Sequence, residues 1–130
     1  MIIGVGIDAV EISRFADWHS KSLARLRRIF SEPEIVYCLQ NPAKSAERFA
    51  ARFAAREAVY KVLHAHAPIP FLTLARAITI TKGQHGKPAL IIDWQLLSTW
   101  DTPLLRTVHW HLSLTHTNTT SIACIIGEVP

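Results

Sequence analysis

The sequence has few of the residues that mark secreted, disulfide-built or membrane proteins. It contains only two cysteines, Cys38 and Cys124, which lie in dissimilar contexts and form no Cys-x-x-Cys pair. A disulfide framework is therefore excluded, and both are expected to be ordinary buried thiols. No apolar run approaches the roughly 20 residues that span a bilayer, and the first residues carry no basic leader with a cleavage site. We therefore expect a cytoplasmic protein with no membrane partner.

Charged residues are also scarce, at 18% against 49% hydrophobic residues, which is typical of a globular chain rather than a disordered one. A chain of 130 residues is long enough for one core, so we expect a single domain over residues 1–130. The high apolar share predicts that copies of the chain cover part of each other's surface. The net charge of +4 and the pI near 9.4 favour an acidic partner, which could be nucleic acid, an anionic surface, a phosphate-rich ligand or an acidic protein.

Hydrophobic periodicity divides the chain into one strand, a helical region and a strand-rich second half. Start signals for helices are Ser31 followed by Pro33, and Asn41 followed by Pro42. The expected elements are, in chain order, a buried central strand over 2–12, short helical pieces over 14–28, helices over 31–39 and 41–65, a hairpin of strands over 77–83 and 88–93, a short helix over 93–100, and strands over 106–117 and 119–129. The pattern predicts an α+β fold in which one long helix packs on a mainly antiparallel sheet.

An acid and an amine, Glu57 and Lys61, stand one turn apart on the alanine-rich long helix. Taken alone they are a surface pair that helps a helix by ~0.2–0.5 kcal/mol. A second acid, Asp8, interrupts the apolar first strand, where a charge is costly unless something compensates it. Carboxylates from two separate elements suit Mg²⁺ with phosphate oxygens, so Asp8 and Glu57 form a candidate magnesium pair. The alternative is that Asp8 accepts backbone hydrogen bonds at the end of its strand.

Polar side chains also alternate along the strand that begins at His109. Period-two alternation places on one face the residues His109, His111, Ser113 and Thr115, with His116 at the following turn. These donors suit phosphate oxygens, but the row could equally face solvent, and His109 with His111 could be a His-x-His zinc site lacking a third ligand. On the long helix, Arg48, Arg52 and Arg56 form an i, i+4, i+8 row, from which we select Arg52 as a phosphate contact.

The motifs follow each other along the whole chain. They are Gly6-Ile7-Asp8 with Glu11 and Arg14-Phe15, Phe30-Ser31-Glu32 with Glu34, Arg52-Phe53-Ala54-Ala55-Arg56-Glu57-Ala58 with Lys61, Gly86-Lys87-Pro88, and His111-Leu112-Ser113-Leu114-Thr115-His116. In order and spacing they resemble the holo-[acyl-carrier-protein] synthases, which are small phosphopantetheinyl transferases. The sequence departs from that family over Leu63–Pro68, where the usual glycine-containing loop after the lysine has no glycine.

The resemblance implies the 4′-phosphopantetheinyl transferase fold and transfer of the phosphopantetheine arm from coenzyme A to a serine of an acyl carrier protein. It further implies release of 3′,5′-ADP, a requirement for Mg²⁺, a role in fatty acid biosynthesis, and a homotrimer whose active sites lie between adjacent subunits. Asp8 and Glu57 match the magnesium ligands of the family. Glu57 or a metal-bound water would take the serine proton, while Mg²⁺ and Lys61 would stabilise charge on the pyrophosphate.

The resemblance also assigns binding residues. Those expected to contact coenzyme A are Arg52, Lys61, Lys82, Gly86, Lys87, Pro88, His111, Ser113, Thr115 and His116, of which the last four come from the neighbouring subunit. Those expected to dock the acidic carrier protein are Arg14, Lys21, Arg25 and Arg28. Two other interpretations stay open. The first is a basic module that binds nucleic acid, although the chain contains no known duplex-reading motif. The second is an inactive or specialised relative that retains the fold.

Overall fold

The chain folds into two small antiparallel sheets and a set of helices, of which one is much longer than the others. The computed structural model describes residues 1–82 and 84–130, so Gly83, the last residue of an expected strand, lies outside the described residues. The strands are β1 (Ile2–Glu11), β2 (Ile78–Lys82), β3 (Pro88–Ile92), β4 (His109–His116) and β5 (Thr120–Glu128). The α-helices are α1 (Leu23–Leu26), α2 (Glu32–Leu39), α3 (Ser45–Leu63), α4 (Phe71–Ala77) and α5 (Pro103–Arg106). Short 3₁₀ turns are η1 (Ile12–Phe15), η2 (Trp18–Ser20), η3 (Pro42–Lys44), η4 (Gln84–Gly86) and η5 (Trp94–Leu97).

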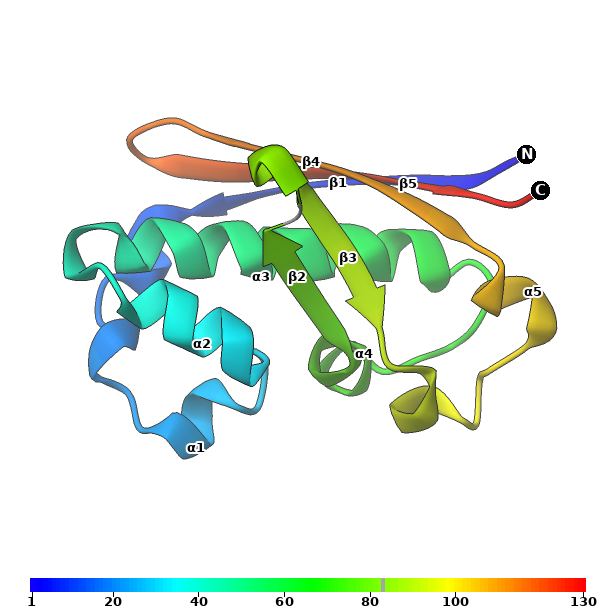
Figure 1. Cartoon of the computed structure of the whole chain (residues 1–130), viewed down its shortest axis with the longest axis horizontal. Coiled ribbons are helices and arrows are strands. Elements are labelled where there is room, and N and C mark those ends of the chain that lie inside the picture. The colour runs from blue at the N-terminus through cyan, green and yellow to red at the C-terminus, as the bar shows by residue number, and fades with distance from the viewer. Residues whose placement is uncertain (83) are drawn as a thin grey trace.

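The larger sheet has three antiparallel strands in the order β1-β5-β4, and the hairpin β2-β3 forms a second sheet. Helix α3 lies along one face of the three-stranded sheet, and the hairpin and the smaller helices lie on the same side as α3 (Figure 1). The predicted α+β fold, with a long helix on a mainly antiparallel sheet, is confirmed. The expected hairpin and the expected pairing of the last two strands are also present.

Helix α3 packs closely on the sheet because most of its inner side chains are small. The buried face combines Phe49 and Val59 with a stripe of alanines, Ala50, Ala54, Ala55 and Ala58. The closest approach is at Gly6 of β1, where an added Cβ would lie 2.0 Å from the carbonyl oxygen of Ala58. Glycine at this position therefore allows the backbone of α3 to rest directly on β1, which sets the spacing between the two elements that carry Asp8 and Glu57.

The expectation that the first strand is central and fully buried is wrong. β1 lies at one edge of the sheet, and β5 occupies the centre. Along β1, Gly6 and Val10 are buried against α3, whereas Val5 and Ile7 point to the other face and are 62% and 59% exposed. Apolar residues on both faces predict burial on both faces, and within one chain only the face toward α3 is covered.

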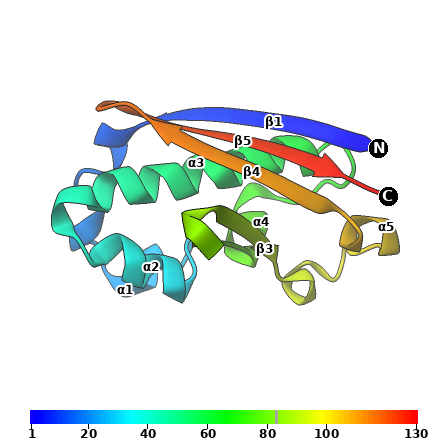
Figure 2. The same cartoon turned by 45° about the horizontal axis from the view of Figure 1, so that its top comes forward.

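The face of the three-stranded sheet opposite α3 is left uncovered by the rest of the chain (Figure 2). Its middle is apolar, and the cross-strand pairs Val5–Ile126, Ile7–Cys124 and Ala9–Ile122 run along it. Cys124 is therefore only half-buried, unlike the fully buried thiol that was expected, while Cys38 is buried as predicted. An apolar face of this kind on a small protein is a candidate contact between copies of the chain.

The helix start signals in the sequence are borne out at α2 and at Asn41-Pro42, where Asn41 caps η3 immediately before α3. α2 begins with a capping box, in which Glu34 Oε1 accepts hydrogen bonds from Ser31 N at 3.0 Å and from Ser31 Oγ at 2.8 Å. Helices α4 and α5 were not anticipated. Pro70 is the N-cap residue of α4, and Pro103 is the first residue of α5, a position where proline is well tolerated. In the described part of the chain, no helix combines the length and the apolar character needed to cross a membrane.

Candidate active site

Asp8, Glu57 and Lys61 come together where β1 crosses α3. Lys61 Nζ donates a hydrogen bond to the carbonyl oxygen of Ile7 at 2.7 Å and lies 3.2 Å from Asp8 Oδ1. The lysine therefore pairs with Asp8 of the strand. Helical spacing alone had suggested a pair with Glu57, one turn away. Asp8 has a side chain that is 18% exposed, on the face of β1 that meets α3.

In the group formed by Asp8, Glu57 and Lys61, the nearby positive charges only partly neutralise the two carboxylates. The pKa of Glu57 is raised by burial and then by the negative charge of Asp8, and the charges of Lys61 and Arg14 offset only part of this rise. A divalent cation would remove the repulsion between the two acids. Mg²⁺ commonly binds one or two carboxylates and completes its coordination with water and substrate phosphates, so Asp8 and Glu57 fit this ion.

A zinc site on the strand that carries His109 finds no support in the described residues. The rings of His109 and His111 stack edge to face with centroids 4.7 Å apart, and His111 Nε2 lies 2.8 Å from Glu128 Oε2. Residues 1–82 and 84–130 nevertheless contain no group of three or more His, Cys, Asp and Glu side chains arranged to hold a metal ion. The histidine pair is thus best described as an exposed cluster in which His111 contacts the carboxylate of Glu128.

The orientation of Glu57 follows from its neighbour Arg56, which is fully buried. The Arg56 guanidinium donates to both carboxylate oxygens of Glu34, with Nη1 2.8 Å from Oε2. It also donates to the carbonyl oxygens of Ile29, Ala75 and Ile78 at 2.9, 3.0 and 2.7 Å. Since successive residues of a helix point about 100° apart, fixing Arg56 inward turns Glu57 toward β1.

A second, basic part of the candidate site is a pocket of about 350 Å³ bounded by α2, α3, the β2-β3 hairpin and β4. Its walls include Arg52, Lys82, Gly86, Pro88 and His116, all expected to contact coenzyme A. Three cations surround the ring of Tyr37: Arg48 and Arg52 have their guanidinium carbons 4.0 and 4.4 Å from its centroid, and Lys82 Nζ is 5.6 Å away. Such a cluster of cations suits an anionic ligand.

One atom of this pocket lacks a partner. Arg52 is 8% exposed, and its buried Nε makes no hydrogen bond within the described residues, because Glu34 Oε2 lies 4.0 Å away. Arg48 Nη1, by contrast, donates to the carbonyl oxygen of Tyr37 at 2.8 Å, and His116 Nε2 lies 3.1 Å from Glu47 Oε1. The sequence row of three arginines is thus divided by function: Arg56 is structural, while Arg48 and Arg52 line the pocket.

The two parts of the candidate site lie at opposite edges of the three-stranded sheet. The carboxylates are at β1, the first edge, and the basic pocket is lined by Leu114 and His116 of β4, the other edge. The structure therefore brings Asp8, Glu57 and Lys61 together and separates them from Arg52, the arginine selected as a phosphate contact. Within one chain the acidic and basic parts do not share a cavity in the described residues.

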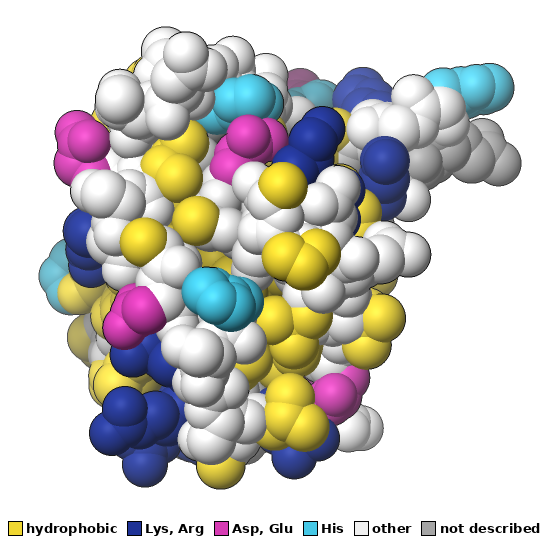
Figure 3. Space-filling model, turned by 90° about the vertical axis from the view of Figure 1, so that its left-hand side faces the viewer, with side chains coloured by type: hydrophobic (Ala, Val, Ile, Leu, Met, Phe, Trp, Pro, Cys, Tyr) yellow, Lys and Arg dark blue, Asp and Glu magenta, His cyan; other side chains and the backbone are white. Residues whose placement is uncertain are grey.

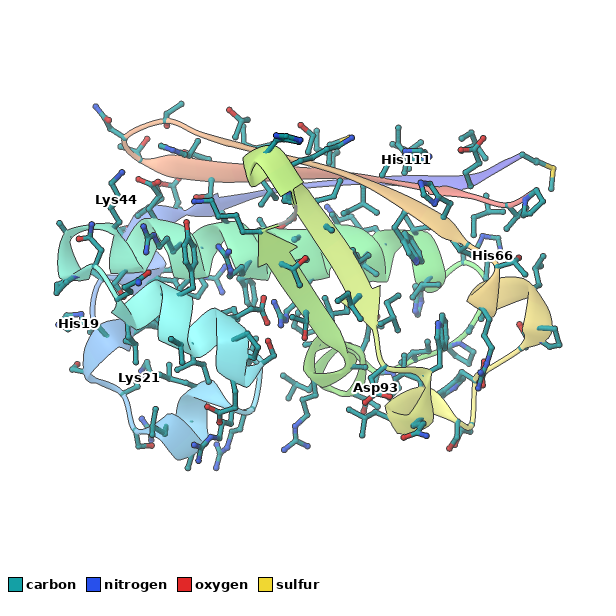
Figure 4. All side chains as sticks on the ribbon, in the orientation of Figure 1. His19, Lys21, Lys44, His66, Asp93 and His111 are labelled. Atoms are coloured by element: carbon teal, nitrogen blue, oxygen red, sulfur yellow. The ribbon has the colours of Figure 1, made fainter. Side chains whose placement is uncertain are left out.

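The remaining residues expected at coenzyme A are distributed over two other places. Lys87 and His111 line a separate cavity of about 270 Å³ between β3 and β4, on which Pro88 also borders. Ser113 and Thr115 lie with His111 on the uncovered face of the sheet, where Figure 4 shows His111 over β4. The predicted alternation along β4 is therefore present, and His116 points to the opposite face from the other three.

The residues expected to dock the carrier protein lie near α1 and η1. Arg14 is 5.2 Å from the centroid of the Phe53 ring, which places it close to Glu57. Lys21, Arg25 and Arg28 line a hollow of about 210 Å³ beside Trp18. Lys and Arg side chains gather at the lower end of the molecule in the side view of Figure 3, the end at which Figure 1 shows α1.

The glycine-free segment after α3 turns without a left-handed residue. His64 N donates to the carbonyl oxygen of Tyr60 at 2.8 Å, and both His66 N and Ala67 N donate to that of Leu63 at 2.8 Å. The His66 ring is held by a contact of 2.9 Å between Nε2 and the carbonyl oxygen of Ile3. Figure 4 shows His66 at the far end of α3 from Lys44. Glycine is therefore not needed for the chain to leave α3 here.

Sequence reasoning missed Tyr37 altogether and left Arg48 without a role. An aromatic residue on a short helix is ordinarily part of the core, so no local signal distinguishes Tyr37. Its position becomes informative only because α2 packs beside α3 and stacks the ring against Arg48 and Arg52.

Comparisons with known proteins agree with this geometry. Residues 4–125 match the family described as the 4′-phosphopantetheinyl transferase superfamily. The chain is 38% identical over 132 residues to a holo-[acyl-carrier-protein] synthase of Treponema pallidum, covering 98% of this chain and 97% of the relative. Among solved structures, it resembles the acyl carrier protein synthase of Mycobacterium tuberculosis, with 30% identity, a TM-score of 0.72 and full coverage of both chains. It also resembles the holo-(acyl-carrier-protein) synthase of Bacillus anthracis in complex with CoA (3′,5′-ADP), with 27% identity, a TM-score of 0.74 and coverage of 100% and 99%.

Proposed function

The chain belongs to the 4′-phosphopantetheinyl transferase superfamily, and from this we propose that it is a holo-[acyl-carrier-protein] synthase. It transfers the 4′-phosphopantetheine arm of coenzyme A to a serine of an apo-acyl carrier protein, releases 3′,5′-ADP and supports fatty acid biosynthesis. It acts in the cytoplasm as one catalytic domain over residues 1–130. The observation that carries this proposal is the meeting of Asp8, Glu57 and Lys61 at one point of the fold.

Asp8 and Glu57 are the residues that would hold Mg²⁺. When bound, this ion supplies positive charge that stabilises the pyrophosphate oxygens of coenzyme A in the transition state. Support comes from the raised pKa of Glu57, which reflects burial and the charge of Asp8.

The reaction is a displacement at the phosphorus that carries the pantetheine arm. The serine oxygen of the carrier forms a bond to this phosphorus, and the bond between the phosphorus and the bridging oxygen breaks, so that this oxygen leaves with 3′,5′-ADP. The serine proton passes to Glu57. Lys61, anchored to the carbonyl oxygen of Ile7, contributes positive charge beside the same group of carboxylates. Arg48, Arg52, Lys82 and His116 of the basic pocket bind phosphate groups at the nucleotide end of coenzyme A.

We further propose that the complete active site forms between subunits of a homotrimer. The acidic part lies at the β1 edge and the basic part at the β4 edge, so a head-to-tail arrangement would bring the β1 edge of one copy to the β4 edge of the next. The uncovered apolar sheet face, with Val5 and Ile7 largely exposed, supplies surface for such an assembly.

Mass spectrometry of the carrier protein tests the reaction. With coenzyme A and Mg²⁺, the wild-type protein should add the mass of one phosphopantetheine arm to an apo-acyl carrier protein. Glu57→Gln, which leaves the buried Arg56–Glu34 pair intact, should lower the rate by at least about 100-fold while keeping the fold. Transfer by this variant at the wild-type rate would disprove the role assigned to Glu57.

Mixing two inactive variants tests the shared site. Glu57→Gln removes the acidic part, and Arg48→Ala with Arg52→Ala removes the basic part. Mixed after dissociation and reassembly in equal amounts, they should regain about a quarter of the wild-type rate, since random mixing in a ring pairs an intact β1 edge with an intact β4 edge at that frequency. No recovery in mixed trimers would show that each site belongs to one chain.

A further inference from the structure

A continuous groove runs from α1 across α4 to η5, outside every residue assigned so far except Lys21, Arg25 and Arg28. It consists of three adjoining hollows. The first, of about 210 Å³, is bounded by Leu72 and by residues of η2, α1 and the segments that flank α1, namely Trp18, Lys21, Arg25, Arg28 and Ile29. The second, of about 300 Å³, is bounded by Arg28, Leu72 and Arg76, and the third, of about 210 Å³, by Thr73, Arg76 and Leu96. Because Arg28 and Leu72 border the first two and Arg76 the last two, the hollows form one surface.

The groove carries positive charge that the fold does not neutralise. Within residues 1–82 and 84–130, neither Arg25, Arg28 nor Arg76 has a carboxylate within ion-pair distance. The acidic residues closest to this region in sequence are already engaged. Asp17 lies 3.9 Å from Lys21 of the same groove, and Glu32 pairs with Arg27. Asp93 caps η5 by accepting a hydrogen bond from Gln95 N at 3.0 Å. The charge is therefore available to an acidic partner.

Two leucines lie between these arginines and face solvent. Leu72 is 57% exposed and Leu96 is 56% exposed, although both sit on elements whose other leucines, Leu74 and Leu97, are fully buried. A phosphate backbone would gain nothing from such side chains. A helix with one apolar face and acidic flanks would bury both leucines and meet the arginines on either side, which is the helix-in-groove mode of recognition.

The groove also adjoins the acidic part of the candidate site through a chain of aromatic rings. Phe71, the first residue of α4, packs against Phe53 and Tyr60 with ring centroids 5.7 and 5.6 Å apart. On the other side of Phe53 lies Arg14, at 5.2 Å from the ring, beside Glu57. A protein bound in the groove is thus positioned to extend a serine side chain toward Asp8 and Glu57.

We propose that Leu72, Arg76 and Leu96 form a second half of the docking surface for the acidic acyl carrier protein, which continues the α1 surface onto α4 and η5. This inference rests on the proposed function and adds residues to which sequence reasoning gave no role. The apolar pair provides contact area at the centre of this half, and Arg76 with Arg28 orients the partner through charge.

Steady-state kinetics with apo-acyl carrier protein, coenzyme A and Mg²⁺ test the surface. Arg76→Glu, and separately the pair Leu72→Ser with Leu96→Ser, should raise KM for the carrier protein about tenfold or more. The kcat and the KM for coenzyme A should stay within about twofold of wild type, because none of these residues lies in the acidic or basic part of the site.

Two variants outside the groove serve as matched controls. Leu104→Ser replaces a leucine of α5 that is also 56% exposed, and Arg106→Glu reverses an exposed arginine of the same helix. Both should leave KM for the carrier protein unchanged. Thermal unfolding of each variant verifies that the fold is retained.

The possible results separate this inference from the proposed function. Absence of transfer by the wild-type protein would overturn both. Normal transfer by the wild type, with an unchanged KM for the carrier protein in the groove variants, would overturn the docking surface alone. A change in the mass of the assembly by sedimentation, without a change in KM, would show that the groove is a contact between copies of this chain and would equally overturn it.

Discussion

Arg56 and Glu57 are adjacent on α3, yet the charge of Arg56 is fully paired within the fold and that of Glu57 is not. Arg56 is buried and pairs with Glu34, and its guanidinium also donates to backbone carbonyl oxygens from three other segments. Glu57 is half-buried beside a like charge, and among the described residues its carboxylate makes no hydrogen bond. The charge of Arg56 stabilises the fold, whereas the charge of Glu57 is compensated only when a ligand binds.

The difference appears in the pKa values of the two glutamates. Burial by itself would raise the pKa of Glu34, but the charge and hydrogen bonds of Arg56 and the hydrogen bonds of Ser31 outweigh it, and the pKa is lowered. The pKa of Glu57 is raised, by burial and by Asp8. Glu34 is therefore stabilised as an anion by folding, whereas folding disfavours the ionised form of Glu57.

The largest effect on stability is expected from breaking the buried pair of Arg56 and Glu34. Arg56→Met leaves Glu34 buried without its partner, and we expect the free energy of unfolding to fall by about 3–5 kcal/mol. Urea denaturation followed by circular dichroism measures this. Arg106→Met, which breaks the exposed pair with Asp101, is the control and should have a far smaller effect. Equal effects of the two variants would contradict a structural role for Arg56.

Removing the charge of Glu57 should have the opposite effect and raise the stability of the metal-free protein. Glu57→Gln relieves the repulsion with Asp8, so the metal-free variant should unfold at a higher temperature than the wild type even though it has lost transfer activity. Added Mg²⁺ should raise the unfolding temperature of the wild type, by an amount equivalent to about 2.7 kcal/mol at 100 times the Kd, and affect the variant much less. A variant that melts below the wild type without Mg²⁺ would argue against a strained carboxylate pair.

The smallest expected effect is a difference in how stability depends on pH. A raised pKa means that the folded protein binds the proton of Glu57 more tightly than the unfolded chain, so this contribution to stability is full at acidic pH and is lost as pH rises through the folded pKa. Glu34 acts in the reverse direction, since its contribution is lost as pH falls through its lowered pKa. The gain in stability of Glu57→Gln over the wild type should therefore be near zero at acidic pH and grow toward neutrality.

Thermal unfolding of both proteins from about pH 4 to about pH 8, without divalent cations, measures this difference. Val36→Gln, a change at a residue of α2 that is 66% exposed, serves as a control and should show a pH profile parallel to that of the wild type. A constant difference between Glu57→Gln and the wild type across this range would mean that the pKa of Glu57 is not raised.

Much of the fold could be predicted locally, because each signal lies within a few residues of its effect. The alternation over His109–Thr115 and the helix start at Ser31 both appear in the structure where expected. The edge position of β1 could not be predicted, since a strand that is apolar on both faces has the same pattern whether its own chain or another copy covers the second face.

The candidate site shows the same division. Regular spacing placed Arg48, Arg52 and Arg56 in one row, but spacing does not say which arginine finds a buried acid. That choice depends on α2, which brings Glu34 to Arg56 and Tyr37 to the other two. Because the partner comes from a different element in each case, no periodicity along α3 distinguishes the three residues.

Sequence by itself determined the strands, the helices α2 and α3, the α+β class, the family and the chemical character of the residues, because these depend on side-chain type and on spacing along the chain. Only the tertiary structure decided that Lys61 pairs with Asp8 and not with Glu57, that the basic pocket opens at the opposite edge of the sheet, and that a groove of arginines and leucines crosses α4. Each of these requires segments distant in the sequence to pack together, and the direct contact of Gly6 with the backbone of α3 shows how closely that packing is specified.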